Sequence, residues 1–135
     1  YRFFDCADKY GDASRLGRLP LHAGKSNGFM AKNDIDFARL YLRHGAKRLF
    51  YRLTLADRID VVFGHFSLRR TVRARQFDEI GDIVKRATRP VLLLGDFNIL
   101  HGLGELDALM TETGLRLLNR PDEHTFRFHQ RHLVL

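Results

Sequence analysis

The sequence predicts an α/β layered domain, because segments with strand and helix patterns alternate along most of the chain. The apolar run at residues 91–94 follows Pro90 and is short for a helix, which indicates a strand covered on both faces. Just before it, apolar residues recur at helical spacing. With 135 residues, 44% of them hydrophobic and 29% charged, the chain can form one domain with a substantial core.

The first half of the chain predicts a loop followed by strands. Residues 11–28 are rich in Gly, Ser and Arg and predict a long loop, a feature that is often functional in a compact domain. Residues 33–44 fit either a helix or a strand. Residues 48–55 and 58–64 predict an antiparallel hairpin that turns at residues 56–57. Its first strand is expected to be half-buried, with alternate apolar positions at Leu49, Tyr51, Leu53 and Leu55.

The second half predicts helix, strand, helix and strand. A helix is expected over residues 71–87, stopped by Pro90. Its apolar stripe consists of Phe77, Ile80, Ile83, Val84 and Ala87. A second helix over residues 105–113 is expected to end at a glycine cap, Gly114. The side chains it is expected to bury are Leu106, Leu109 and Met110. Residues 115–118 predict a last strand.

Two polar residues follow the strand at residues 91–94, in the tetrapeptide 95–98 (GDFN). If the chain stays extended, Asp96 and Asn98 point to one face and Phe97 points into the core. Gly95 has no side chain, which would let a ligand approach the backbone. Asp and Asn are also common turn residues, so a simple strand-to-loop turn is the competing interpretation.

The tetrapeptide resembles the signature of the endonuclease/exonuclease/phosphatase superfamily. Residues 61–68 (VVFGHFSL) resemble that family's strand ending in His, and residues 69–83 resemble the helix that follows it. Residues 28–32 resemble an earlier strand, so the resemblance covers most of residues 28–128. It implies two packed mixed sheets flanked by helices, a four-layer α/β/β/α sandwich of which this chain supplies about the second half.

The resemblance also implies a metal-dependent phosphoesterase, most simply a nuclease-like phosphodiesterase. Asp96 would orient or deprotonate water, and Asn98 and His65 would donate hydrogen bonds to a phosphoryl oxygen. The implied cofactor is Mg²⁺ or Mn²⁺, with ligands that this sequence does not identify. Arg69 and Arg73 lie one helical turn apart and are candidate phosphate contacts, although two such arginines also suit a solvated face.

Other interpretations of the same residues stay open. A lone histidine such as His65 is often a hydrogen-bonded core residue, and Asn98 could cap a turn. The domain could bind phosphate or nucleic acid without catalysis, or act on a phospholipid or inositol phosphate. Lys and Arg outnumber Asp and Glu by 23 to 16, and the resulting charge of +7 favours an anionic partner such as nucleic acid. A solvated basic surface would give the same charge.

The remaining features concern compartment and completeness. No apolar run approaches the roughly 18 residues of a membrane span. Cys6 is the single cysteine, which favours a reducing, cytoplasmic location. The family's metal-binding Glu and closing Asp-His pair have no match here, and residues 124–135 resemble the approach to that pair. We therefore expect residues 1–135 to form a single partial domain that, by itself, binds Mg²⁺ poorly and hydrolyses little.

Overall fold

The centre of the fold is a mixed four-stranded sheet with two helices on one face. The computed structural model describes residues 2–7, 27–120, 126–128 and 131–133. The strands stand in the order β3 (Asp36–Tyr41), β4 (Leu49–Leu55), β5 (Ile59–His65) and β6 (Val91–Asp96). The first three are antiparallel and β6 is parallel to β5. This arrangement confirms the general α/β class, and within the ambiguous segment 33–44 it shows a strand over residues 36–41.

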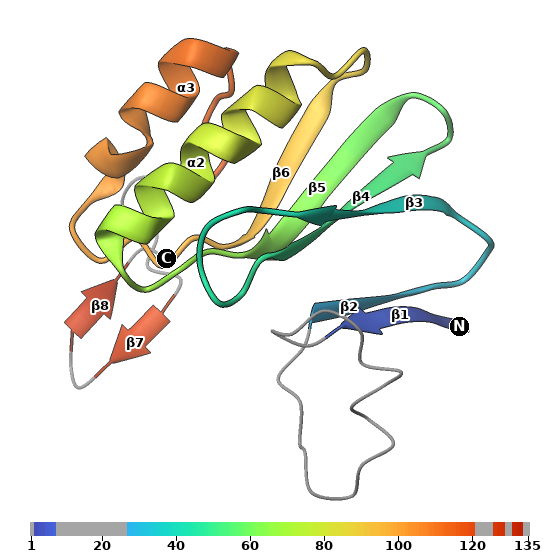
Figure 1. Cartoon of the computed structure of the whole chain (residues 1–135), viewed down its shortest axis with the longest axis horizontal. Helices are drawn as coiled ribbons and strands as arrows, with labels where there is room; N and C mark the ends of the chain where they lie inside the picture. The colour runs from blue at the N-terminus through green and yellow to red at the C-terminus, as the bar shows by residue number, and fades with distance from the viewer. Residues whose placement is uncertain (1, 8–26, 121–125, 129–130, 134–135) are drawn as a thin grey trace, which may run out of the picture.

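The helices cover one face of this sheet and a two-stranded ribbon lies on its other side (Figure 1). The helices are α2 (Arg70–Lys85) and α3 (Asp107–Thr113), and the latter follows a 3₁₀ turn, η1 (Leu103–Leu106). The ribbon pairs β1 (Arg2–Ala7) with β2 (Asn27–Ala31). A second ribbon pairs β7 (Phe126–Phe128) with β8 (Arg131–Leu133). Most of the predicted loop, residues 11–26, lies outside the described residues, and its last two residues begin β2.

The β4–β5 hairpin turns where the sequence predicts. The amide of Arg58 donates to the carbonyl of Leu55 at 2.9 Å, and Ala56 and Asp57 have φ angles of 48° and 54°. Positive φ at both central residues defines the type I′ turn, whose twist matches that of the two strands it joins. The hairpin prediction is therefore confirmed in both its position and its direction.

The main core lies between the sheet and the helices. Phe66 is fully buried, with its ring centroid 4.8 Å from that of Phe50 and 4.7 Å from that of Phe77. Gly64 makes room for this cluster, because a Cβ there would lie 2.4 Å from the Phe50 ring. The predicted stripe of α2 therefore faces the sheet as expected, with Ile83 and Val84 only partly buried. The helix ends at Lys85, so the predicted end at residue 87 is wrong and Ala87 lies beyond the helix.

The opposite face of the sheet carries a second, aromatic cluster. Tyr51 is fully buried there, stacked on Phe63 with centroids 5.2 Å apart. Phe29 from β2 packs against the edges of both rings. Since Phe50 and Tyr51 are both 0% exposed, β4 is buried on both faces at its start. The prediction of a half-buried strand is wrong at this end, because the sheet is covered on both sides there, by the helices and by β2.

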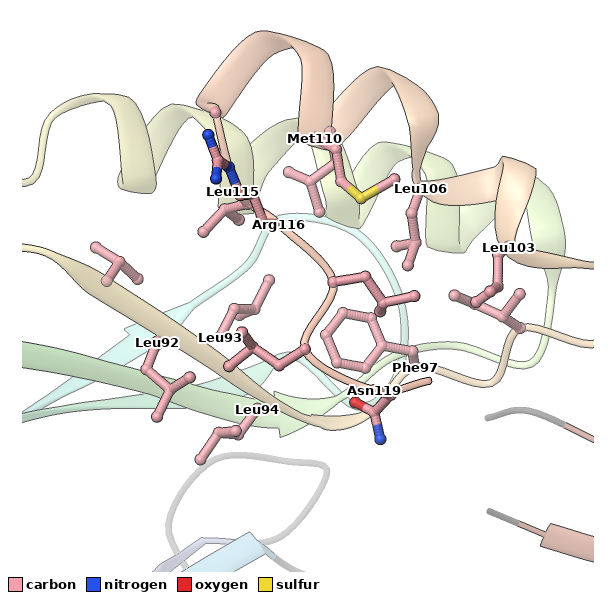
Figure 2. A pocket seen from close by; sticks show the side chains of 16 residues that line it. Leu92, Leu93, Leu94, Phe97, Leu103, Leu106, Met110, Leu115, Arg116 and Asn119 are labelled. Carbon is pink, nitrogen blue, oxygen red and sulfur yellow. The ribbon is translucent and has the colours of Figure 1, made fainter. Parts of the chain in front are cut away.

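Two predictions for the C-terminal part are also wrong. Strand β6 forms an edge of its sheet, and Leu94 is 45% exposed, so β6 is not covered on both faces. Residues 115–118 form no strand; they run beside β6 and, with α3, enclose an apolar cavity of about 340 Å³ (Figure 2). The end of α3 is as predicted: Gly114 has φ 72°, and its amide donates to the carbonyl of Met110.

No helix in the described part of the chain is long and apolar enough to cross a bilayer.

Candidate functional site

The candidate site forms where two parallel strands end side by side. His65 is the last residue of β5 and Asp96 the last of β6, and the two are paired in register. Their side chains therefore leave the sheet on the same face, and His65 Nδ1 lies 3.3 Å from Asp96 Oδ2. The two side chains are 25% and 38% exposed, so solvent and a small ligand can reach both. The predicted proximity of these residues is confirmed.

Asn98 joins the site through a turn and not through strand alternation. Strand β6 ends at Asp96, and Asn98 has φ 52°, a left-handed conformation that Asn tolerates. Asp96 Oδ1 accepts the Asn98 amide at 3.0 Å and so stabilises this turn. The Asn98 side-chain Nδ2 donates to the Phe66 carbonyl at 2.8 Å and lies 3.1 Å from His65 Nε2. Asn98 thus both shapes the turn and faces His65, while Phe97 packs in the core as predicted.

Gly95 is required by the neighbouring strand. Its φ is 142°, and a Cβ at this position would lie 2.0 Å from the carbonyl oxygen of Gly64, its partner on β5. No side chain can occupy that space without separating the strands that carry His65 and Asp96. That Gly95 also lets a ligand approach the backbone stays a prediction.

Lys47 is a site residue that the sequence does not reveal. It lies in the connection between β3 and β4, and its Nζ is 3.1 Å from His65 Nε2. No motif links the two residues, which are 18 positions apart. Only topology could have indicated the contact: β4 runs antiparallel to β5, so the start of β4 lies beside the end of β5.

The connection that carries Lys47 is fastened to helix α2 by two side chains. Gln76, which is fully buried, donates to the carbonyls of His44 and Lys47 at 3.0 and 3.1 Å. Glu79 accepts the amides of Arg43 and His44, and its Oε1 lies 2.6 Å from His44 Nδ1. Burial would raise the pKa of Glu79, but these hydrogen bonds outweigh it and hold the pKa below its ordinary value.

The surroundings of His65 favour its neutral form. Burial lowers the pKa of His65, the Asp96 carboxylate opposes this, and the positive charge of Lys47 adds to the lowering. The net pKa lies below the ordinary value of 6.5. Because a carboxylate only accepts hydrogen bonds, the ring hydrogen belongs on Nδ1, toward Asp96. The Nε2 lone pair then faces two donors, Lys47 Nζ and Asn98 Nδ2.

The two arginines predicted to contact phosphate have different positions. Arg73 is 0% exposed: it pairs with Glu105 at 2.6 Å and donates to the carbonyls of Ser67 and Leu68. It therefore ties the start of α2 to η1, and the prediction that it binds phosphate is wrong because its side chain does not reach the surface. Arg69 is exposed at the start of α2, as a phosphate contact requires.

The described residues do not by themselves form a site for Mg²⁺. No group of three or more His, Cys, Asp or Glu side chains in the described part of the chain could hold a metal. Asp96 is the one carboxylate among the site residues, and its two oxygens already face the Asn98 amide and His65 Nδ1. Mg²⁺ prefers carboxylate oxygens in octahedral geometry, so this arrangement does not fit it.

The large apolar cavity is distinct from this site. Its lining comes from β6, the following residues Phe97 and Ile99, η1, α3 and residues 114–119, and includes neither His65 nor Asp96. The labelled side chains of Figure 2 are almost all leucines and other apolar residues, without a group suited to acid–base chemistry.

Comparison with known proteins adds no family: no family model, no curated protein and no solved structure matches this chain.

Proposed function

We propose that the chain carries the site of a phosphoesterase that hydrolyses a phosphodiester. One observation carries the proposal: two nitrogen donors, Lys47 Nζ and Asn98 Nδ2, converge on one point beside the partly exposed carboxylate of Asp96. Phosphate-ester hydrolysis needs donors for the charge that develops on the phosphoryl oxygens and a group that orients water. Lys47 and Asn98 can supply the hydrogen-bond donors, and Asp96 can orient the water.

The proposed chemistry starts from the hydrogen bonds already present. A phosphoryl oxygen near His65 would accept hydrogen bonds from Lys47 Nζ and Asn98 Nδ2, the two donors that now face His65 Nε2. Asp96 would orient the attacking water and accept its proton, while His65 Nδ1 and the Asn98 amide hold the carboxylate in place. As the water oxygen bonds to phosphorus, the P–O bond to the leaving alcohol breaks and the leaving oxygen takes a proton from solvent. Neutral His65 has no hydrogen on Nε2, so the donor role predicted for it would require protonation. A nearby anionic phosphate favours that protonation.

The sequence resemblance further implies Mg²⁺ or Mn²⁺ as cofactor and a four-layer sandwich as the complete fold. The described residues do not make a metal site, so no step of the proposal passes through a metal ion. The sandwich is supported by the second apolar face of the sheet, where Tyr51 and Phe63 pack together. The cytoplasmic location stays a prediction.

The test is the variant Asp96→Asn in the full-length protein, assayed for hydrolysis of a generic phosphodiester with and without added Mg²⁺. The change keeps the volume and removes the charge that a water-orienting acid needs. We expect turnover to fall by about 10²–10⁴-fold, the usual contribution of a general base. The matched control is Asp78→Asn, which removes one exposed carboxylate on α2 and should leave turnover unchanged.

The outcomes separate the enzyme from a binding module. Equal turnover in Asp96→Asn and in the parent would show that Asp96 is only a turn residue. Phosphate binding without hydrolysis in the parent, under every metal condition, would instead favour the non-catalytic alternative.

A further inference from the structure

We propose that Lys47 is the cation that contacts the substrate phosphate, with its position set by Gln76. This inference rests on the proposed function and adds to it the role of the Lys47 charge in phosphate binding and a structural reason for the position of Lys47. It makes the β3–β4 connection part of the site, although the sequence signatures lie only at the ends of β5 and β6.

In the part of the chain that the structure describes, the ammonium of Lys47 has no carboxylate to balance its charge. Among the described residues its Nζ contacts the neutral ring of His65, and no carboxylate lies within ion-pair distance. Nε2 of His65 has a single lone pair, yet both Lys47 and Asn98 point donors at it. One donor is therefore poorly satisfied. An anionic oxygen, which accepts several hydrogen bonds, would satisfy both.

The position of Lys47 is also built into the fold. Gln76 is fully buried and uses both of its polar side-chain atoms: Nε2 donates to the carbonyls of His44 and Lys47, and Oε1 accepts the Ser67 amide at 2.8 Å. Ser67 lies two residues beyond His65. One buried side chain therefore joins the segment that carries Lys47 to the segment that follows His65. A simple surface lysine would need no such support.

The backbone at Gly45 fits the same role. Gly45 has φ 96°, and a Cβ there would lie 2.7 Å from Gln76 Nε2. The connection is thus shaped to let Gln76 reach its carbonyls. This preorganisation reduces the entropy lost when the lysine binds an anion.

The experiment titrates the chain with inorganic phosphate and follows the His65 ring by NMR. In the parent we expect saturable shifts of the His65 signals and a rise of its pKa. In Lys47→Met, phosphate affinity should fall by about tenfold or more, as expected when a charged hydrogen bond is removed. Without phosphate, the pKa of His65 should rise in this variant, because Lys47 lowers it in the parent.

Two further variants serve as controls. Arg48→Met removes the same charge from the adjacent, exposed position and should keep the parent affinity. Lys47→Arg keeps the charge and should retain phosphate binding. If the parent binds phosphate at His65 and Lys47→Met binds it equally well, the role of Lys47 is refuted. The proposed function then rests on Asn98 and Asp96, and the Asp96→Asn assay tests it separately. If the parent shows no binding at His65, both proposals fail.

Discussion

At the scale of single residues, the ring of His65 links the chemistry of the site to its stability. Its two nitrogens face opposite kinds of group, a carboxylate on one side and two donors on the other. Protonation would add a hydrogen on Nε2 directly opposite the Lys47 ammonium. The folded protein therefore resists protonation of His65 more than the unfolded chain does.

This resistance predicts a pH dependence of stability. The pKa of His65 in the folded protein lies below its ordinary value of 6.5. At a pH between the folded pKa and 6.5, the unfolded chain therefore binds more protons than the folded protein. The free energy of unfolding should fall as pH drops from about 6.5 through the folded pKa, and the decrease should level off below it. Urea unfolding at pH 7.5 and 5.5 measures it. His65→Gln should show a smaller difference, and an identical difference in both proteins would contradict the prediction.

A second prediction at this scale concerns Gly95. Gly95→Ala should destabilise the fold by about 1–3 kcal/mol or more, because the added methyl group meets the Gly64 carbonyl on the adjacent strand. Gly102→Ala is the matched control: Gly102 also has positive φ, at 97°, but nothing lies within 4 Å of its Cβ position. Chemical denaturation of both variants separates the clash from the backbone strain. Equal destabilisation would show that strain alone explains the glycine.

At the scale of elements, Arg73 and Glu105 hold helix α2 and η1 together. The pair is almost completely excluded from water, and Glu105 Oε1 has no hydrogen-bond partner among the described residues. Removing the arginine alone would leave a buried carboxylate without its counter-charge. Breaking a buried pair in this way is far more costly than removing an exposed one.

We therefore predict that Arg73→Met costs about 3–5 kcal/mol of unfolding free energy. Arg69→Met, at the exposed position one turn earlier, should change it by about 0.5 kcal/mol or less. Adding Glu105→Leu to Arg73→Met should recover much of the stability, because no unpaired charge remains. Denaturant midpoints of the three variants measure this. A minor effect of Arg73→Met would show that the buried pair contributes little to stability and would contradict this prediction.

The sequence predicts elements better than it predicts their surroundings. The hairpin at residues 56–57, the helix near residues 70–85 and the cap at Gly114 follow from local patterns, and the structure agrees with them. Phe50 and Leu94 differ from expectation, because burial of a strand depends on which distant segments cover it. Residues 115–118 have strand-like composition, but no strand in the described residues pairs with them.

The same distinction applies to the candidate site. The tetrapeptide and the strand-end histidine identify Asp96, Asn98 and His65. The positions of Asp96 and His65 follow from strand ends in register, whereas Asn98 reaches the site through the turn after β6. Lys47 enters through a hairpin connection, and Arg73 is removed by a buried interaction with a residue 32 positions away. The positions of Lys47 and Arg73 both depend on tertiary interactions, which the periodicity and spacing of residues in the sequence cannot predict.

At the scale of the whole molecule, the charge of +7 gives the proposed site a basic setting. Arg69 and Arg70 are exposed at the start of α2, directly after the strand that carries His65. The first turn of α2 contains no acidic residue, so the positive end of the helix dipole adds to these charges. The start of α2 is therefore the part of this helix that is best suited to bind the phosphate backbone of a nucleic acid.

We therefore predict that the chain binds duplex DNA at low salt, with log affinity falling linearly as log salt concentration rises. The double variant Arg69→Gln, Arg70→Gln should reduce the salt slope by about 2, roughly one unit for each phosphate that an arginine no longer neutralises. Arg86→Gln is the control, because Arg86 is exposed at the other end of this helix, about 24 Å away by the helical rise. Fluorescence anisotropy with a labelled DNA duplex, repeated across a salt series, measures all three slopes.

Equal slopes in the parent and the double variant would place the DNA-binding surface elsewhere. If no binding occurs at low salt, the charge serves another partner, and a small phosphate ester such as an inositol phosphate becomes the stronger substrate class, because such a ligand needs only the local donors Lys47 and Asn98.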